Sequence, residues 1–344
     1  MPVPIAETTR GGIVESVHHG VVVAVDVSGE IVAAAGDPDL TVFFRSSAKP
    51  FQAIPAIESG AADAFAFTPA ELALCCASHE GSPEHQRQVA AMLAKIGLSA
   101  ADLQCGCPLP GDEREAARVV LGEVDRSPLQ CDCSGKHAGM LATIVREGLS
   151  RHDYLDPAHP LQLRILGIMA EVMRFPASSI VLRTDGCSLP TFGAPIRAFA
   201  TAFATLAAPG SVPFEAGRQH AKALDRLRTA MTAHPENVAG RGQFVTDLMA
   251  LSEGRIVAKS GAEGLICLGV PQRGLGIAIR VLDGSFRAHP EIVLAALEQL
   301  DVLDVETRAA IAERHSPELR NHNHRLVGEI RPAFQLHRQA PAVA

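Results

Sequence analysis

The chain has 344 residues, enough for one large domain or for two lobes that share a core. Hydrophobic residues make up 47% of it, but aromatic side chains are scarce, with no Trp, one Tyr and 13 Phe. The formal net charge of −7 and the lack of any Lys/Arg run argue against binding to nucleic acids or anionic membranes.

The N-terminal segment, residues 1–12, contains no apolar run of the kind that forms a secretory signal. No stretch of the chain reaches the roughly 18 apolar residues of a membrane helix. We therefore expect a soluble, cytoplasmic protein. Its eight cysteines are then expected to be free thiols or metal ligands, because reducing compartments disfavour disulfides.

The first 45 residues have the pattern of a β-meander. Apolar residues alternate over 21–27, a Ser-Gly turn follows at 28–29, and a short run at 31–33 returns beside the first. A further predicted strand over 41–45 leads directly into Ser46.

The middle of the chain predicts helices. Apolar residues recur with helical spacing over 89–96 and 161–172. Ser82 and Gly97 mark the two ends of the first of these helices. A further helix is predicted over 137–147.

The chain then returns to β-structure, with three predicted strands at 255–259, 264–270 and 275–281. A hairpin loop is predicted at 271–274, and a last helix over 293–300. The tail from about Arg331 is expected to be frayed.

The order of strands, helices, strands and helix predicts an α+β fold in which both chain ends build one antiparallel sheet. Residues 1–344 are expected to form a single two-lobed unit. The sheet lobe would take approximately 10–65 and 245–335, and a mainly helical lobe would take approximately 66–244. No Gly-rich dinucleotide-binding pattern follows a strand.

Ser46 and Lys49 have the S-x-x-K spacing at a junction of strand and helix. Residues three apart share a helix face, so the Lys49 amine can approach the Ser46 hydroxyl and act as its base once deprotonated. Pro50 must then lie in the first helical turn, and Pro55 is expected to kink the helix. The simpler alternative is a capping serine with a lysine that reaches into solvent.

Two more segments offer the same chemistry. Ser78 follows an apolar helical run in a turn-forming stretch, where it could equally be a capping serine. Lys259 begins a Lys-Ser-Gly element that closes a strand, and such an element beside S-x-x-K is the pattern of β-lactamases and penicillin-binding proteins. Two lysines close together would lower each other's pKa, which would keep both amines basic.

Cysteines also predict a metal site. One ligand set that would give zinc its four ligands is Cys131, Cys133, His137 and Cys187. A second is Cys105, Cys107, Cys131 and Cys133. Lys136 lies in the predicted first turn of a helix, where the macrodipole helps an amine to lose its proton and bind a metal.

Taken together, these motifs resemble those of the rhizobial-type (class 3) L-asparaginases, over about residues 10–335. The resemblance rests on five segments: 45–50 (RSSAKP), 77–81 (ASHEG), 133–137 (CSGKH), 184–187 (TDGC) and 259–264 (KSGAEG). It implies a fold like that of the serine β-lactamases and bacterial glutaminases, a homodimer, and hydrolysis of L-asparagine to L-aspartate and ammonia.

The resemblance also implies roles for individual residues. Two adjacent serine–lysine tandems would be formed by Ser46 with Lys49 and by Ser78 with Lys259. Zn²⁺ would be held by Cys133, Lys136 and Cys187, so that Cys131 and His137 drop out of its first shell.

We expect Ser46 to attack the amide, with Ser78 as the alternative nucleophile. Arg45 could pair with the substrate carboxylate, since a guanidinium suits a bidentate contact. Asp185 could accept the substrate ammonium, with His137 beside it.

Two other functions stay open. The first is the same chemistry on glutamine or another amide. The second is a non-catalytic zinc or thiol sensor that uses Cys105, Cys107, Cys131 and Cys133, a function that leaves both serine–lysine motifs unexplained.

Overall fold

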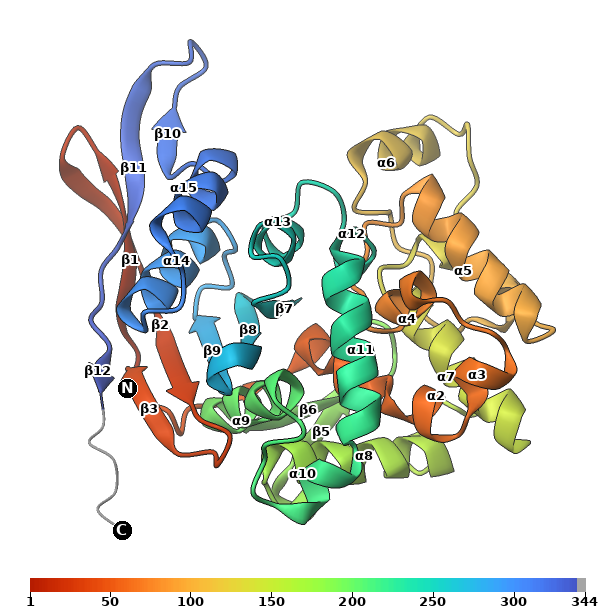
Figure 1. The fold of residues 1–344 in the computed structure, drawn as a ribbon. Coiled ribbons are helices and arrows are strands. Elements are labelled where there is room, and N and C mark those ends of the chain that lie inside the picture. The colour runs from red at the N-terminus through yellow and green to blue at the C-terminus, as the bar shows by residue number, and fades with distance from the viewer. Residues whose placement is uncertain (339–344) are drawn as a thin grey trace.

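The computed structural model describes residues 1–338, in which a curled antiparallel sheet lies beside a helical part (Figure 1). Segments from the two chain ends build the sheet, and most of the helices lie between them in sequence. This confirms the α+β arrangement predicted from the order of the elements. Within the described residues, no helix has the length and apolar character needed to cross a membrane.

The large sheet has nine strands in the part of the chain that the structure describes. Seven follow in the order β10-β11-β1-β2-β9-β8-β7, and β3 pairs with both β2 and β12. The bounds are Val3–Arg10 (β1), Ile13–Val25 (β2), Ile31–Ala35 (β3), Val257–Gly261 (β7), Leu265–Val270 (β8), Leu275–Val281 (β9), Glu318–Arg320 (β10), Leu326–Pro332 (β11) and His337–Arg338 (β12). The N-terminal strand β1 therefore lies inside the sheet, and β7 lies at its edge.

Helix α9 (Ile196–Ala207) covers one part of this sheet and packs on β2, β8 and β9. It can approach β9 because residue 276 is a glycine: a Cβ there would lie 1.9 Å from the carbonyl oxygen of Ala200. Burial on both sides explains why Val21 to Val25 of β2 are all fully buried, and why that strand is a continuous apolar run.

Three further helices lie in the C-terminal part of the chain. They are α13 (Phe244–Leu251), α14 (His289–Gln299) and α15 (Val305–Arg314). Helix α13 packs on β7, and α14 packs on β1 and β11.

A small second sheet contains the strands that precede Arg45 and Asp185, two of the predicted site residues. Its strands are β4 (Thr41–Phe43), β6 (Pro190–Pro195) and β5 (Val181–Thr184), in that order. Both outer strands run antiparallel to β6, so the ends of β4 and β5 point in the same direction. Arg45 follows β4 and Asp185 follows β5.

The helical part contains the remaining helices. They are α1 (Lys49–Gln52), α2 (Ile54–Glu58), α3 (Ala61–Ala64), α4 (Pro69–Cys75), α5 (Pro83–Lys95), α6 (Glu113–Val120), α7 (Ser134–Glu147), α8 (Pro160–Met173), α10 (Glu215–Gln219), α11 (Ala221–Ala233) and α12 (Pro235–Val238). The predicted helices over 89–96, 137–147 and 161–172 are confirmed as α5, α7 and α8. The helix after Ser46 is broken between α1 and α2, next to Pro55.

The prediction of a frayed tail is wrong for residues 331–338. Arg331 pairs with Glu7 in the β1–β11 ladder, and β12 adds to β3 through His337 and Arg338. The sequence signal was weak because these strands are mostly solvent-exposed and carry little apolar alternation. The last six residues of the chain, 339–344, lie outside the described part.

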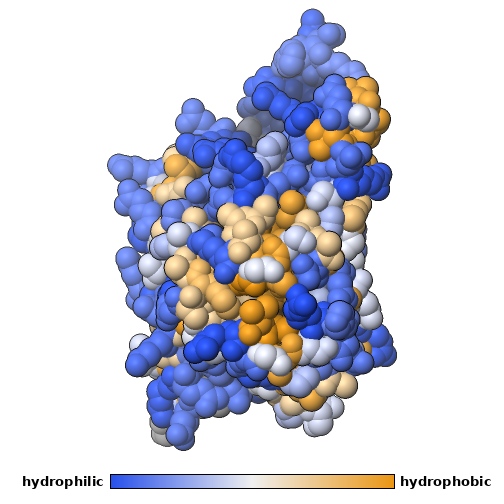
Figure 2. Space-filling view, turned by 90° about the vertical axis from the view of Figure 1, so that its right-hand side faces the viewer, coloured by the Kyte–Doolittle hydropathy of each residue, from blue (hydrophilic) through white to orange (hydrophobic). Residues whose placement is uncertain are grey.

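One face of the helical part carries hydrophobic residues among charged ones. Figure 2 shows this face, the right-hand side of Figure 1, with a hydrophobic patch at its centre. Contiguous apolar patches on a protein surface often mark contact sites for other molecules.

Candidate active site

The hydroxyl of Ser78 lies between two lysine amines. Lys49 Nζ is 2.8 Å from Ser78 Oγ, and Lys259 Nζ is 2.9 Å from the same oxygen. Lys49 begins helix α1, Ser78 follows helix α4, and Lys259 lies in strand β7. Three distant segments of the chain therefore meet at one hydroxyl group.

Close packing holds strand β7 against the segment that carries Ser46. The Ser47 hydroxyl donates a hydrogen bond to the carbonyl oxygen of Lys259 at 2.9 Å. Gly261 leaves room for this approach, since a Cβ there would lie 3.0 Å from the carbonyl oxygen of Phe44. Lys259 Nζ also donates to the carbonyl of Ser260, the next residue, at 2.8 Å.

The two lysines differ in their electrostatic surroundings, although both side chains are fully buried. Burial and, next, the charge of Lys49 together lower the pKa of Lys259 to about 7. Burial also opposes the charge of Lys49, but the Cys133 thiolate and the Asp132 carboxylate outweigh it and raise the pKa of Lys49. Asp132 Oδ2 is 3.4 Å from Lys49 Nζ.

The expectation that the two lysines lower each other's pKa is confirmed for Lys259, whose pKa is lowered by the charge of Lys49, and is wrong for Lys49, whose pKa is raised. Lys49 remains an ammonium group near neutral pH, while Lys259 loses its proton over the same range. Asp132 was missed as a neighbour of Lys49 because nothing in the sequence marks an aspartate between two cysteines as the partner of a lysine 83 residues away.

Ser46 lies in a short 3₁₀ turn, residues 45–48, just before α1, and is partly exposed. The amine of Lys49 is directed to Ser78 rather than to Ser46. Among residues 1–338, no side chain or backbone group forms a hydrogen bond with Ser46 Oγ. The hydroxyl of Ser46 is therefore free to meet a ligand, whereas that of Ser78 is enclosed by two amines.

Two of the predicted substrate-binding residues pair with each other. Arg45 Nε donates to Asp185 Oδ1 at 2.7 Å, and the Asp185 side chain is only 10% exposed. Arg45 has a φ of 47°, in the left-handed region that residues other than glycine rarely adopt. Strain of this kind is often found at functional sites. The turn directs the Arg45 guanidinium toward Asp185. Arg45 immediately precedes Ser46 in the sequence.

His137, the third predicted substrate-binding residue, is fully buried in helix α7. Its Nδ1 lies 2.7 Å from the hydroxyl of Tyr154, the one tyrosine of the chain. Within the described residues, its Nε2 has no hydrogen-bond partner. Burial, together with the charge of Lys136, lowers the pKa of His137 to about 3, so the ring is neutral at physiological pH.

The three residues predicted to bind zinc come together at the start of helix α7. Lys136 Nζ is 3.1 Å from Cys187 Sγ. A hydrogen bond from Cys133 and the charge of Lys136 lower the pKa of Cys187 to about 5, against the effect of burial. A hydrogen bond from Cys131 lowers the pKa of Cys133 to about 7. Two thiolates are a donor set that suits zinc, so the residues present fit this metal.

The charge state of Lys136 differs from the expectation that the helix N-terminus would help it to lose its proton. The negative charges of Cys187 and Cys133 outweigh burial and raise its pKa. A metal ion would have to displace this proton before the amine could become a ligand.

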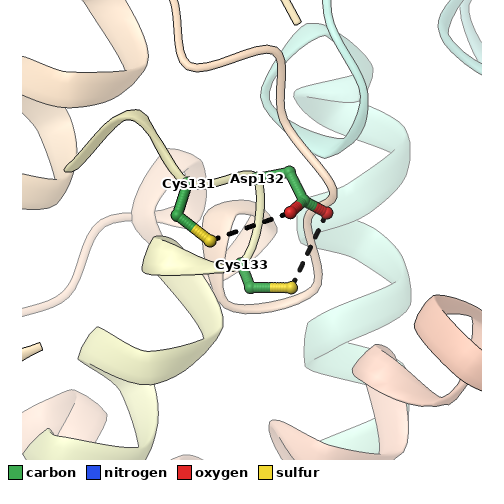
Figure 3. Close-up of side chains that lie close together, drawn as sticks. All are labelled: Cys131, Asp132 and Cys133. Carbon is green, nitrogen blue, oxygen red and sulfur yellow. Dashed lines mark hydrogen bonds between the residues drawn. The ribbon is translucent and has the colours of Figure 1, made fainter. Parts of the chain in front are cut away.

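A second group of metal-ligating atoms lies next to the first. Figure 3 shows Cys131, Asp132 and Cys133, whose ligand atoms all lie within 4.8 Å of one another. Asp132 accepts from the thiols of Cys131 at 3.8 Å and of Cys133 at 3.6 Å. This cluster could hold a metal, and it shares Cys133 with the predicted site. Cys131 also donates to the carbonyl of Cys105 at 3.5 Å.

Several solved structures resemble this chain at low sequence identity. Mglu has 15% sequence identity and a TM-score of 0.37, and the match covers 82% of this chain and 67% of Mglu. For Mglu in its tris and glutamate form, the identity is 16% and the TM-score is 0.38, and the match covers 87% of this chain and 64% of that chain. A Bacteroides dorei DSM 17855 protein assigned as a beta-lactamase has 12% identity and a TM-score of 0.40, over 76% of this chain and 85% of its own.

The chain thus spans about two thirds of the length of Mglu. No curated protein sequence matches the chain significantly. A family match, in contrast, covers nearly the whole sequence, from residue 6 to residue 332, and includes every segment that meets at Ser78. The chain belongs to the family described as L-asparaginase II.

Proposed function

We propose that the chain hydrolyses L-asparagine to L-aspartate and ammonia by serine–lysine chemistry. One observation carries the proposal: the buried amines of Lys49 and Lys259 both lie within 3 Å of the hydroxyl of Ser78. Amines are placed in this way around a hydroxyl where protons have to be moved, and an uncharged lysine is a base that can accept one.

In the proposed mechanism, Ser46 attacks the side-chain amide carbon. Its hydroxyl is partly exposed and free of hydrogen bonds to the described residues, so its lone pairs are available to a substrate. As the bond to carbon forms, the Ser46 proton would pass to Ser78 in the substrate complex, and Ser78 would pass its own proton to Lys259, whose pKa of about 7 allows it to accept the proton and later to return it to the leaving ammonia. Lys49 remains charged and stabilises the negative charge that develops on oxygen.

The second half-reaction releases the product. Water attacks the acyl ester on Ser46 while Ser78 and Lys259 take up its proton. The proton then returns to Ser46 Oγ as the ester C–O bond breaks and aspartate leaves. The alternative assignment, with Ser78 as nucleophile, uses the same two lysines and gives the same products.

The substrate's charged groups would meet Arg45 and Asp185. The guanidinium suits the α-carboxylate and the Asp185 carboxylate suits the α-ammonium. The two side chains already pair with each other, so the free site holds both in place and balances their charges before substrate arrives. His137 is neutral and would contribute hydrogen bonding rather than charge.

We propose zinc as the metal and Cys133, Lys136 and Cys187 as the residues that hold it. A thiolate-rich shell is typical of structural zinc, so the ion would supply fixed positive charge and order the substrate pocket. Proton transfer and nucleophilic attack are assigned to serine and lysine alone.

The chain is further proposed to act in a reducing compartment and as a homodimer. None of the eight cysteines, all within the described residues, forms a disulfide, which supports the cytoplasm. The hydrophobic patch in Figure 2 is a surface that a second copy could cover.

The test is ammonia release from L-asparagine and L-glutamine, measured side by side. We expect L-asparagine to be preferred, and preference for L-glutamine would instead assign a glutaminase. No ammonia from either amide, together with metal content that follows redox state, would favour the thiol sensor.

The nucleophile is tested by trapping the acyl-enzyme in acid and mapping it by mass spectrometry. We expect the +Asp adduct on the peptide that contains Ser46, and none in Ser46→Ala. Ser78→Ala should lower turnover by about 10²- to 10⁴-fold, as expected for loss of a proton carrier. An adduct on Ser78 would assign the attack to that residue.

A further inference from the structure

A cavity of about 430 Å³ lies beside strand β7, between helix α13 and the segment that leads into α14. The lining residues on which the argument depends are Gln243, Phe244, Ser260, Phe286, Arg287 and His315. Ammonia, the leaving group of a primary amide, needs only a small part of this volume. Cavities of this size are typical of sites for whole small molecules.

The cavity begins at the residue next to a predicted catalytic lysine. Ser260 lines it, and the Ser260 carbonyl oxygen lies 2.8 Å from Lys259 Nζ. The same amine lies 2.9 Å from Ser78 Oγ. A group attached to the scissile amide nitrogen could therefore extend along the edge strand β7 and enter the cavity.

The lining has a distinct apolar part. Phe286 is 49% exposed, which is unusual for a ring of this size, and it stands edge-on to His289 with 5.1 Å between the centroids. Phe244 stands edge-on to His315 at 5.3 Å. These two phenylalanines provide the surface that an aromatic or aliphatic side chain of a ligand would cover.

The lining also contains the guanidinium of Arg287, which hydrogen bonds hold in place and which forms no direct ion pair within the described residues. Arg287 donates from Nε to His18 Nε2 at 3.0 Å and from an Nη to Ser16 Oγ at 2.8 Å. The neighbouring carboxylate of Asp283 pairs with His18 instead. No carboxylate in residues 1–338 forms an ion pair with Arg287. A preorganised guanidinium of this kind suits a carboxylate.

The segment that lines the cavity opposite β7, which includes Gln243, forms hydrogen bonds with the segment that contains Ser78. The Ser78 backbone N–H donates to the carbonyl of Val238 at 2.9 Å, and Gln243 Nε2 donates to Glu80 Oε1 at 2.5 Å. Gly240 lets the loop pass close to Glu80, since a Cβ there would lie 2.1 Å from the carboxylate. The cavity is thus fixed relative to the reacting hydroxyls by both of its sides.

We propose that this cavity is a leaving-group subsite for N-substituted side-chain amides of aspartate. The substituent would combine an apolar body, placed against Phe244 and Phe286, with a terminal carboxylate, placed at Arg287. The proposal rests on the amide hydrolysis proposed above and extends it from ammonia to larger amines as leaving groups.

The reaction balances in the same way as for L-asparagine. Ser46 Oγ forms an ester with the acyl carbon as the C–N bond breaks, and the amine leaves with the proton that Lys259 returns to it. Water then cleaves the ester to give aspartate, without any oxidant or reductant.

The experiment compares three substrates of the full-length protein: L-asparagine, β-aspartyl-L-phenylalanine, and the C-terminal amide of that dipeptide. We expect release of phenylalanine from the dipeptide. Arg287→Gln should raise KM for the dipeptide by roughly 10- to 100-fold, as loss of a charge-assisted contact would, and leave L-asparagine hydrolysis unchanged. The C-terminal amide, which has no carboxylate, should not respond to this substitution.

Two further variants sharpen the comparison. Phe286→Ala should raise KM for both dipeptide substrates and not for L-asparagine. Arg273→Gln changes an exposed arginine outside the cavity and should change none of the three. A protein that releases ammonia from L-asparagine but not phenylalanine from the dipeptide would overturn the subsite, as would an equal effect of Arg287→Gln on all three substrates.

Binding separates failure of the subsite from failure of the catalytic proposal. Titration calorimetry of Ser46→Ala with β-aspartyl-L-phenylalanine needs no turnover. We expect binding that weakens by roughly tenfold or more when Arg287→Gln is added. Binding without hydrolysis in the unmodified protein would contradict the proposed chemistry and keep the subsite, whereas no dependence on Arg287 would reject the subsite.

Discussion

Lys49 and Lys259 approach the same atom, Ser78 Oγ, at 2.8 and 2.9 Å, from segments that are far apart in the sequence. One lies at the start of a helix near the N-terminus, and the other lies in the edge strand of the large sheet. Their pKa values are moved in opposite directions, and in the proposed mechanism this gives the two amines different tasks: Lys49 would donate a hydrogen bond and Lys259 would accept a proton.

Substitution of Lys49 by methionine should shift the pH dependence of hydrolysis. In the unmodified protein, kcat/KM should rise as pH passes through about 7, where Lys259 becomes neutral. Without the charge of Lys49, the pKa of Lys259 rises, so the rise in kcat/KM should move to higher pH. Turnover should also fall, by about 10²-fold or more.

The measurement is kcat/KM from pH 5 to pH 9. Lys95→Met is the matched control, since Lys95 pairs with Glu71 and not with the site. Its pH profile should not change. An unshifted profile in Lys49→Met would mean that Lys259 is not the group that controls the reaction.

Metal content should distinguish the two overlapping groups of ligands. If Cys133, Lys136 and Cys187 hold zinc, Cys133→Ala and Cys187→Ala should lose the ion and Cys131→Ala should retain it. The readout is metal stoichiometry of the purified proteins by mass spectrometry. Loss in Cys131→Ala with retention in Cys187→Ala would assign the metal to the cluster shown in Figure 3.

Removal of the metal by a chelator should also lower the thermal midpoint, because the site joins the start of α7 to the loop that carries Cys187. Cys187→Ala should show no further decrease on chelation. A decrease of equal size in that variant would point to metal bound elsewhere.

His220 predicts a pH-dependent stability. This buried ring lies between two carboxylates, with Nδ1 2.6 Å from Glu58 and Nε2 2.6 Å from Glu171. Burial opposes the charged ring, but the two carboxylates outweigh it and raise the pKa of His220. The stabilisation is therefore complete below the unfolded pKa of about 6.5 and is lost as pH rises through the folded pKa.

Calorimetry should show this loss between pH 5.5 and pH 9. Over this range, the thermal midpoint of the unmodified protein should decrease by roughly 2–4 °C more than the thermal midpoint of His220→Gln decreases. The matched control is His152→Gln, at an exposed position. Parallel pH profiles for the unmodified protein and His220→Gln would exclude a contribution from this ring.

Two glycines in helices should respond to alanine in opposite ways. A Cβ on Gly135 of α7 would lie 2.4 Å from the carbonyl oxygen of Leu74, so Gly135→Ala has to move α7 away from α4 and should destabilise the fold by about 1–3 kcal/mol. Gly167 of α8 has no atom within 4 Å of the added Cβ, and Gly167→Ala should stabilise by about 0.4–1 kcal/mol. Denaturant unfolding measures both changes, and a loss of stability in Gly167→Ala would contradict this reasoning.

Much of the fold could be predicted from the sequence where periodicity is strong. The strands at 264–270 and 275–281 correspond to β8 and β9, and helix α5 begins after its predicted cap, Ser82. Helix α9 was not predicted. Its polar residues Arg197, Thr201 and Thr205 recur at every fourth position, but they are few in an Ala-rich segment. All residues of the helix except Arg197 are buried, so it lacks the charged face that marks a surface helix.

The candidate site could be predicted in its residue types but not in its partners. Spacing suggested that Lys49 serves Ser46, since the two are one helical turn apart. In the fold, the Lys49 amine is directed instead to Ser78, and the negative charges of Asp132 and Cys133 lie beside the same buried amine. Such long-range contacts leave no local trace in the sequence, and neither does the cavity beside Ser260.

The position of β1 inside the sheet has a consequence for synthesis of the protein. Strand β2 can pair with β9, and β1 with β11, only once these later strands have been synthesised. Lys259, in β7, likewise has to be synthesised before its amine can reach Ser78. A chain that stops before residue 259 would therefore contain Ser46 and Ser78 but lack one of the two amines that meet at Ser78, and under the proposed mechanism it would have no base to accept the proton.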